Sequence, residues 1–165
     1  MTSAIAIRDY APTDEAALIG LVQDLQRFEE PFFDRLVPAA EIGPWDIERL
    51  LAGCAKNKGF IRLATRDGTV VGYATILTEA AMDVADDPGV VPFSYAYIGE
   101  LCVAPGQRGG GIGQLMIADC EALARRAGAK WLRISSLSGN QRACQIYQAA
   151  GFAEHRVIFE KALES

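Results

Sequence analysis

The sequence predicts an α/β fold, built as a single domain over residues 1–165, in which helices flank a mixed sheet. Three observations predict it. Stretches with a helical spacing of apolar residues alternate with strand-like stretches along the chain. Two strand-like stretches are typical of a hairpin around Asp67-Gly68. A strand, a glycine-rich loop and a helix then follow one another over residues 97–127, as in a crossover connection. The 165 residues are 50% hydrophobic, which is sufficient for one buried core.

The first three elements are a strand and two helices. Residues 3–8 alternate enough to form a first strand. Thr13 stands before two acidic residues, which is typical of a helix N-cap. The helix that it begins would bury four residues, Leu18, Leu21, Val22 and Leu25. Pro44 begins a second helix, which extends to about Lys56.

The elements on either side of the crossover unit are predicted from turn signals. We expect the hairpin strands at residues 60–65 and 70–77. Aspartate, proline and glycine are frequent in residues 80–94, which predicts a loop. After the crossover we expect a strand at residues 131–136, then a short helix, then a closing pair of strands over residues 152–163.

Charge and composition narrow the class of protein. The net charge of -5 and the lack of a basic run argue against a nucleic-acid-binding surface. No apolar stretch approaches the roughly 20 residues of a membrane span. Arg8 and Asp9 interrupt any N-terminal signal core, so we expect a cytoplasmic protein that binds no membrane. The four cysteines lack C-x-x-C pairing and His155 is the sole histidine, so we expect reduced thiols and no metal site.

The stretch CVAPGQRGGGIGQLM, residues 102–116, places five glycines around Arg108. An apolar strand, residues 97–103, precedes it, and apolar residues recur at helical spacing over residues 112–127. A helix N-terminus presents unpaired N–H groups at the positive end of its dipole, so this unit predicts an anion-binding site. Neither common nucleotide pattern fits, because Gln114 stands where G-x-G-x-x-G needs glycine and Ile112 where a P-loop needs lysine.

The pattern Arg108-x-x-Gly111-x-Gly113 resembles motif A of the Gcn5-related N-acetyltransferases, the GNAT superfamily. The resemblance extends over nearly the whole chain and is weakest at residues 26–45. It implies a mixed, mostly antiparallel central sheet flanked by helices, with a splayed strand pair that binds acetyl-CoA and a bulge near Gly99. Backbone amides of the loop would hold the pyrophosphate, without a metal. The cofactor-binding residues that it implies here are Leu101, Cys102, Val103, Arg108, Gly109, Gly110, Gly111, Ile112, Gly113 and Gln114.

A second motif lies in the stretch NQRACQIYQAAGF, residues 140–152. Asn140 is a suitable helix N-cap and Gly151 a suitable helix end. Periodicity alone predicts that Tyr147 is a core aromatic residue. The spacing of Asn140, Ala143, Tyr147 and Gly151 resembles GNAT motif B, however. That resemblance implies that Asn140, Ala143 and Tyr147 border CoA, with the Tyr147 hydroxyl near the thioester sulfur.

The chemistry of amine acetylation requires a base and benefits from an acid. At pH 7 only about one part in two thousand of a primary amine with a pKa near 10.4 is deprotonated. The leaving thiolate gains from a proton donor, for which Tyr147 is the candidate. Glu100, on the strand that leads into the glycine loop, is the candidate base, acting directly or through water. An ion pair of purely structural role is the alternative for Glu100.

Two classes of function follow from these residues. The first is an N-acetyltransferase, in which an amine attacks acetyl-CoA directly in a ternary complex. The second is a non-catalytic CoA-binding module of the same fold. An acyl-cysteine route through Cys102 or Cys144 lacks a histidine that could activate either thiol.

The acceptor could be a small-molecule amine or an amine of a peptide or protein, and a homodimer is compatible with the sequence. Acidic and aromatic residues that would suit a cationic amine are Phe28, Glu29, Glu30, Phe32, Phe33, Asp34, Asp83, Asp86 and Asp87.

Overall fold

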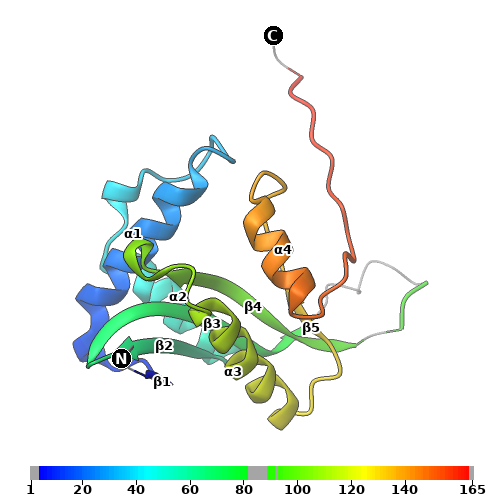
Figure 1. Ribbon diagram of the computed structural model, residues 1–165. Coiled ribbons are helices and arrows are strands. Elements are labelled where there is room, and N and C mark those ends of the chain that lie inside the picture. Colours follow the sequence, from blue (N-terminus) through cyan, green and yellow to red (C-terminus); the bar gives the residue numbers. More distant parts are fainter. Residues whose placement is uncertain (1–3, 82–88, 92, 164–165) are drawn as a thin grey trace.

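The computed structural model describes residues 4–81, 89–91 and 93–163 (Figure 1). Its centre is a five-stranded sheet in the order β1-β2-β3-β4-β5. The strands are β1 (Ile5–Asp9), β2 (Phe60–Arg66), β3 (Thr69–Ala81), β4 (Ser94–Val103) and β5 (Leu132–Ile134). All neighbouring strands are antiparallel except β4 and β5, which are parallel. The predicted mixed, mostly antiparallel sheet is therefore confirmed.

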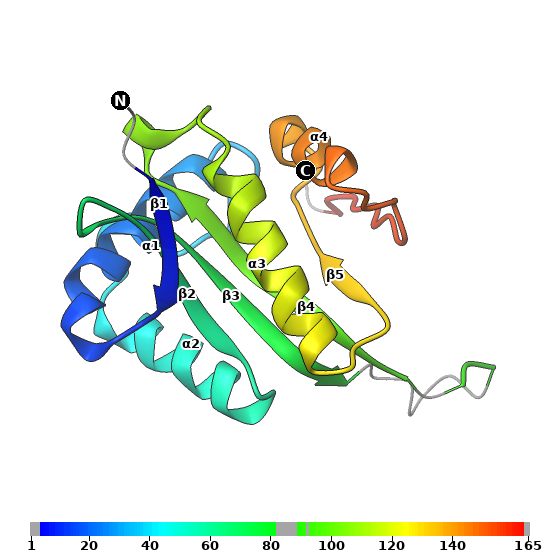
Figure 2. The same cartoon turned by 60° about the horizontal axis from the view of Figure 1, so that its bottom comes forward.

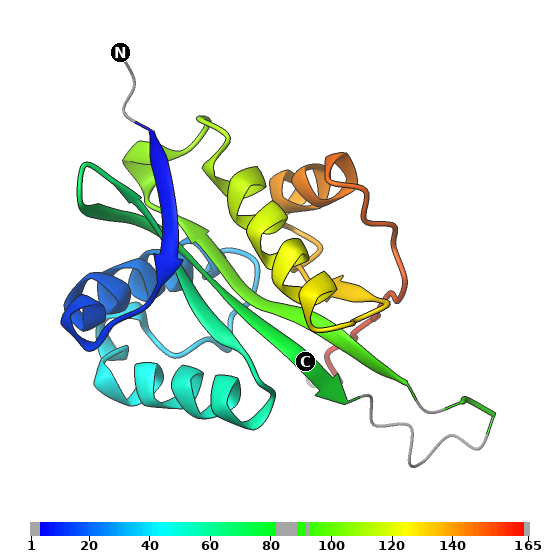
Figure 3. The same cartoon turned by 90° about the horizontal axis from the view of Figure 1, so that it is seen from below.

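Helices cover both faces of this sheet (Figures 2 and 3). The helices are α1 (Glu15–Glu29), α2 (Pro44–Lys56), α3 (Ile112–Arg126) and α4 (Gln141–Ala149), with single 3-10 turns at Pro12–Asp14, Ala39–Glu41 and Pro105–Gln107. On one face, α1 and α2 bury an apolar cluster with Leu63 and Tyr73 of the sheet. On the other face, α3 buries Met116 and Cys120 against Ala74 and Ile98. Burial of two clusters on opposite faces holds the sheet between the helices.

The entry to α1 differs from the prediction. Thr13 does not cap the helix, because residues 12–14 form a 3-10 turn and α1 begins at Glu15. The Asp14 carboxylate accepts hydrogen bonds from the Ala11 amide (2.9 Å) and from the Arg8 guanidinium (2.7 and 2.8 Å). A carboxylate that accepts hydrogen bonds from both groups stabilises this turn more than a threonine hydroxyl would.

The splayed strand pair begins at a bulge on β4. Thr75 of β3 pairs with Glu100, and the next residue, Ile76, pairs with Ile98, so Gly99 is the extra residue. A Cβ atom at Gly99 would lie 2.9 Å from the Thr75 hydroxyl oxygen, which explains why glycine is needed there. β4 is paired with β5 over Ala96–Ile98, and it continues beyond that pairing to Val103. The bulge predicted at Gly99 is therefore confirmed.

The predicted closing strands at residues 152–163 are wrong. The described residues of this segment form no strand, and Figure 1 shows the red chain extending away from the domain. Its apolar side chains are exposed, with Ile158 at 85% and Phe159 at 92% of their maximal area. Apolar side chains favour a strand only where a partner strand accepts the backbone hydrogen bonds, and no strand in the described residues pairs with this segment.

No helix in the described ranges combines the length and apolarity required to cross a membrane.

Candidate acetyl-transfer site

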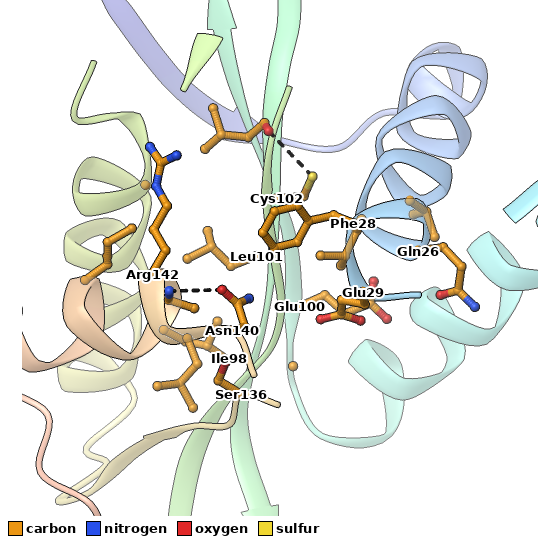
Figure 4. A pocket seen from close by; sticks show the side chains of 18 of the residues that line it. Gln26, Phe28, Glu29, Ile98, Glu100, Leu101, Cys102, Ser136, Asn140 and Arg142 are labelled. Carbon is orange, nitrogen blue, oxygen red and sulfur yellow. Dashed lines mark hydrogen bonds between the residues drawn. The ribbon is translucent and has the colours of Figure 1, made fainter. Parts of the chain in front are cut away.

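A cavity of about 850 Å3 opens beside the splayed part of β4 (Figure 4). It is lined by α1 and α2 on one side, by β5 and α4 on the other, and by the glycine loop and the start of α3 at one end. Every predicted cofactor-binding residue except Gly110 lines this cavity, as do Glu100 and Tyr147. The two sequence motifs, about 30 residues apart in the chain, therefore border one space.

The glycine loop takes a conformation that favours glycine at two positions. Gly109 has φ of 86° and Gly111 has φ of 78°, in the left-handed region that side chains disfavour. Gly111 is the N-cap residue of α3, and no side chain caps this helix end. In the first backbone hydrogen bond of the helix, the Leu115 amide donates to the Gly111 carbonyl oxygen. The amide groups of the first turn are thus available to an anion in the cavity.

Arg108 fixes this loop against its surroundings. Its Nε donates to the Val103 carbonyl oxygen (2.9 Å), at the end of β4. Its guanidinium carbon lies 4.7 Å from the centre of the Phe28 ring on α1, a cation–π distance. Arg108 therefore joins the glycine loop, β4 and α1, besides adding positive charge at this end of the cavity.

The second motif places its residues on α4. The Asn140 side-chain oxygen accepts from the Ala143 amide (3.1 Å), which confirms the predicted cap. The Tyr147 ring packs edge-on against Phe152, with ring centres 6.2 Å apart. Burial raises the pKa of Tyr147 to about 12, and the nearby charge of Glu29 adds to the effect. The phenol is therefore protonated at neutral pH and can donate a proton or a hydrogen bond.

Glu100 is held by a network whose partners the sequence did not predict, and its ion pair with Arg49 is of the kind expected from the structural alternative. Its carboxylate accepts from Arg49 of α2 (2.8 Å) and from the Tyr73 hydroxyl of β3 (2.7 Å). Its backbone amide donates to the Thr75 hydroxyl (2.9 Å). Arg49 also donates to Asp46 (2.7 Å), which raises the pKa of the guanidinium. Glu100 is thus held in a defined position beside a permanent positive charge.

The predicted acceptor-side residues divide into three groups. Phe28 and Glu29 line the cavity. Four others do not line it, namely Glu30, Phe32, Phe33 and Asp34. The predicted residues Asp83, Asp86 and Asp87 lie outside the described residues.

Residues after α1 still help to enclose the cavity. Arg35 lines it, lies 4.5 Å from the Phe33 ring centre and pairs with Glu160 through two contacts of 2.7 and 2.9 Å. Phe32 packs so closely against Gly139 that a Cβ there would lie 2.6 Å from its ring. These contacts bring the chain after α1 against the loop before α4.

The cysteines are free thiols. Burial raises the pKa of Cys54 and Cys102 to about 11 and that of Cys120 to about 12. Cys102 is therefore a protonated, poorly nucleophilic thiol at neutral pH, although its residue borders the cavity. Within the described ranges, no cluster of three or more His, Cys, Asp or Glu side chains is arranged to hold a metal ion.

The model of the acetyltransferase (GNAT) family matches residues 21–152. Among curated proteins, the chain is similar to the aminoalkylphosphonate N-acetyltransferase of Salmonella typhimurium. The two are 32% identical over 102 residues, which are 62% of this chain and 62% of that protein. The match thus spans less than two thirds of the relative.

Solved structures share the fold over nearly their whole length. A BH1408 protein variant from Bacillus halodurans has a TM-score of 0.84 at 18% identity, covering 96% of this chain and 99% of that one. The aminoglycoside N-acetyltransferase AAC(6')-Iy in complex with CoA has a TM-score of 0.72 at 21% identity, covering 99% and 97%. At these identities the similarity shows the fold.

Proposed function

Since the chain belongs to the acetyltransferase (GNAT) family, we propose that it transfers an acetyl group from acetyl-CoA to a primary amine, by direct attack within a ternary complex. The observation that carries this proposal is the meeting of the glycine loop, the splayed β4, Glu100 and Tyr147 around one cavity. The non-catalytic CoA-binding module is the alternative. Two potential proton-transfer groups in the lining of one cavity, Glu100 and Tyr147, favour the enzyme.

Acetyl-CoA would lie along the end of the cavity formed by the two motifs. Backbone amides of residues 109–114 would hold the pyrophosphate, because they carry the positive end of the α3 dipole. The backbone of residues 101–103, beyond the parallel pairing with β5, would hydrogen-bond the pantetheine arm. Asn140 and Ala143 would border CoA from the other side. The proposed reaction uses no metal ion.

The transfer proceeds by proton removal at one end and proton donation at the other. An ammonium group gives up a proton at the acidic end of the cavity, where Glu100 lies. This proton reaches Glu100 directly, through water, or through a second carboxylate. The neutral amine then attacks the thioester carbonyl carbon, and the C–S bond breaks with its electron pair on sulfur. The Tyr147 hydroxyl gives this thiolate a proton. The nitrogen loses its second proton, which restores Tyr147, so each turnover releases one proton to solvent.

A small cationic amine is the proposed acceptor. Three carboxylates line the acceptor end of the cavity, where α1 and α2 meet β4, namely those of Glu29, Asp46 and Glu100. Arg49 of α2 pairs with two of them, and the other guanidiniums of the lining come from Arg35 after α1, Arg108 of the glycine loop and Arg142 of α4. One Asp46 oxygen is buried and has no hydrogen-bond partner in the part of the chain that the structure describes. Unbalanced negative charge in a cavity favours a cation. The similar Salmonella protein is named for acetylation of an aminoalkylphosphonate, which supports a small primary amine as the acceptor, whereas the preference for a cation rests on the carboxylates of this cavity.

The direct test is an acceptor screen with purified protein and acetyl-CoA, in which free thiol release is measured. Amino acids, aminoalkylphosphonates, polyamines, aminoglycosides and lysine peptides would each be compared with a reaction without acceptor. We expect thiol release that depends on an amine and yields an N-acetylated product by mass spectrometry. Acetyl-CoA binding without turnover across the whole panel would instead favour the non-catalytic module.

Added salt should weaken the binding of a cationic acceptor to the carboxylates of the cavity. We expect the KM of a cationic acceptor to rise with added NaCl, because salt screens its attraction to the carboxylates. The matched control is a neutral acceptor of similar size, whose KM should change little. Equal kcat/KM for an anionic acceptor and a cationic one would contradict the proposed acceptor class.

Glu100→Gln should lower both activity and stability. Glutamine cannot pair as an ion with Arg49, so we expect a lower melting temperature and a fall of about tenfold in kcat/KM for the amine. The pH profile of kcat/KM then separates two roles. A loss that shrinks as pH rises indicates that Glu100 itself takes the proton, because free amine becomes abundant. A loss of constant size indicates that its charge acts on another group.

A further inference from the structure

Glu29, the last residue of α1, is a carboxylate in the cavity that the sequence did not single out as catalytic. Figure 4 shows its carboxyl group beside that of Glu100, the first on α1 and the second on β4. Among the described residues, the Glu29 side chain has no hydrogen bond or ion pair. Glu100 differs, because both its carboxylate oxygens already accept from Arg49 and Tyr73. Of the two neighbours, Glu29 is the one free to bind a ligand.

Glu29 lines the same cavity as Glu100 and Tyr147, and its carboxyl group lies beside that of Glu100 (Figure 4). The charge of Glu100 acts on Glu29, and the charge of Glu29 acts in turn on Tyr147 and Cys102. Glu29 therefore shares one cavity with Glu100 and with the proposed proton donor. A group that accepts a proton from the attacking nitrogen needs this position, because nitrogen and sulfur are bonded to one carbon in the tetrahedral intermediate.

From this position in the cavity we propose that Glu29 binds the ammonium group of the acceptor and accepts its proton, while Glu100 supplies fixed charge beside it. This inference rests on the proposed function. The N–H bond of the ammonium breaks, and the Glu29 carboxylate becomes a carboxylic acid, which later loses its proton to solvent. The neutral nitrogen keeps its electron pair for attack on the thioester carbonyl.

The surroundings of Glu29 suit this task. Burial raises the pKa of Glu29, and the charge of Glu100 raises it further, which makes Glu29 a better proton acceptor than an exposed glutamate. The titratable and charged groups that line the cavity around it are Glu100, Cys102 and Arg108 from β4 and the glycine loop, Asp46 and Arg49 from α2, Arg142 and Tyr147 from α4, and Arg35. Three of the four cations among them have other partners: Arg49 holds Glu100, Arg35 holds Glu160, and Arg108 holds Val103. Arg142 of α4 has no hydrogen bond or ion pair within the described residues, and it borders the cavity from the side opposite α1.

The experiment compares Glu29→Gln with Glu30→Gln. Glu30 is the exposed neighbour, does not line the cavity, and would keep its weak contact with the Ala39 amide through the glutamine oxygen. We expect Glu29→Gln to lower kcat/KM for the amine about tenfold at pH 7, with the loss shrinking toward pH 9 as free amine increases. The Kd of acetyl-CoA should stay unchanged. Glu30→Gln should leave all of these values at the wild-type level.

A second readout does not depend on activity. The pKa of Glu29 is higher in the folded protein than in the unfolded chain, so the folded state binds this proton more tightly. Wild-type stability therefore falls as pH rises through the range above the unfolded pKa near 4.5. Glu29→Gln removes this loss, so its melting temperature relative to that of wild type should be higher at pH 8 than at pH 4.

The outcomes separate this inference from the function itself. A wild-type protein that acetylates no amine contradicts the proposed function. An active wild-type enzyme whose Glu29→Gln variant keeps its kcat/KM and pH profile contradicts the inference alone. An activity loss in Glu29→Gln that stays constant with pH also overturns it, because that result indicates binding without proton transfer.

Discussion

Replacing Tyr147 by phenylalanine should lower kcat by about 10- to 1000-fold while acetyl-CoA affinity is nearly unchanged. The substitution removes the hydroxyl and keeps the ring, so the packing against Phe152 remains. The hydroxyl is protonated at neutral pH because burial raises the pKa of Tyr147 to about 12. Its loss leaves the departing thiolate without a proton donor. Steady-state kinetics with a saturating amine measure kcat, and calorimetry measures acetyl-CoA binding.

The leaving group provides the control for this prediction. An acetyl thioester of a more acidic thiol needs less protonation as it departs, so the Tyr147→Phe defect should shrink with such a donor. Phe152→Leu tests packing separately, because it removes the edge-on ring contact while keeping the tyrosine hydroxyl. A defect of equal size with both donors would contradict the role of Tyr147 as an acid and indicate a positioning role.

Gly111→Val should weaken acetyl-CoA binding by about 10- to 100-fold. Valine is disfavoured at φ of 78°, so the first turn of α3 would have to shift, and its side chain would stand where the amides meet the phosphates. Calorimetric titration with acetyl-CoA measures the Kd, and circular dichroism establishes that the variant is folded. An unchanged Kd would contradict the placement of the pyrophosphate at this loop.

Substitutions at two neighbouring glycines distinguish strain in the backbone from obstruction of the ligand. Gly113 also lines the cavity, but its φ is ordinary and a Cβ there meets no atom within 4 Å. Gly113→Ala is therefore unstrained, and any loss of acetyl-CoA affinity comes from contact with the ligand. Gly106 does not line the cavity and is likewise unhindered, so Gly106→Ala should bind as wild type does.

Residues close together in the sequence predicted much of the site. Gly111 and Asn140 occupy the left-handed N-cap and the side-chain cap that suit their residue types. Such features depend on backbone dihedrals and short-range hydrogen bonds, which residues close in sequence decide. The helical spacing after Gly111 likewise sufficed to predict α3. The sequence could also place Glu100 and Tyr147 in the same cavity, because each lies within a recognisable motif.

The sequence by itself therefore determined the mixed sheet, the glycine loop and the lining of the cofactor end. Tertiary structure alone decided the acceptor end, because its contacts join residues far apart in the chain. Arg49 is 51 residues from Glu100 and Tyr73 is 27 residues from it, and no local pattern marks either as its partner. The same holds for the chain after Phe152, whose apolar residues predicted strands. A strand requires a partner for its backbone hydrogen bonds, and whether a sheet edge lies within reach is a property of the folded chain.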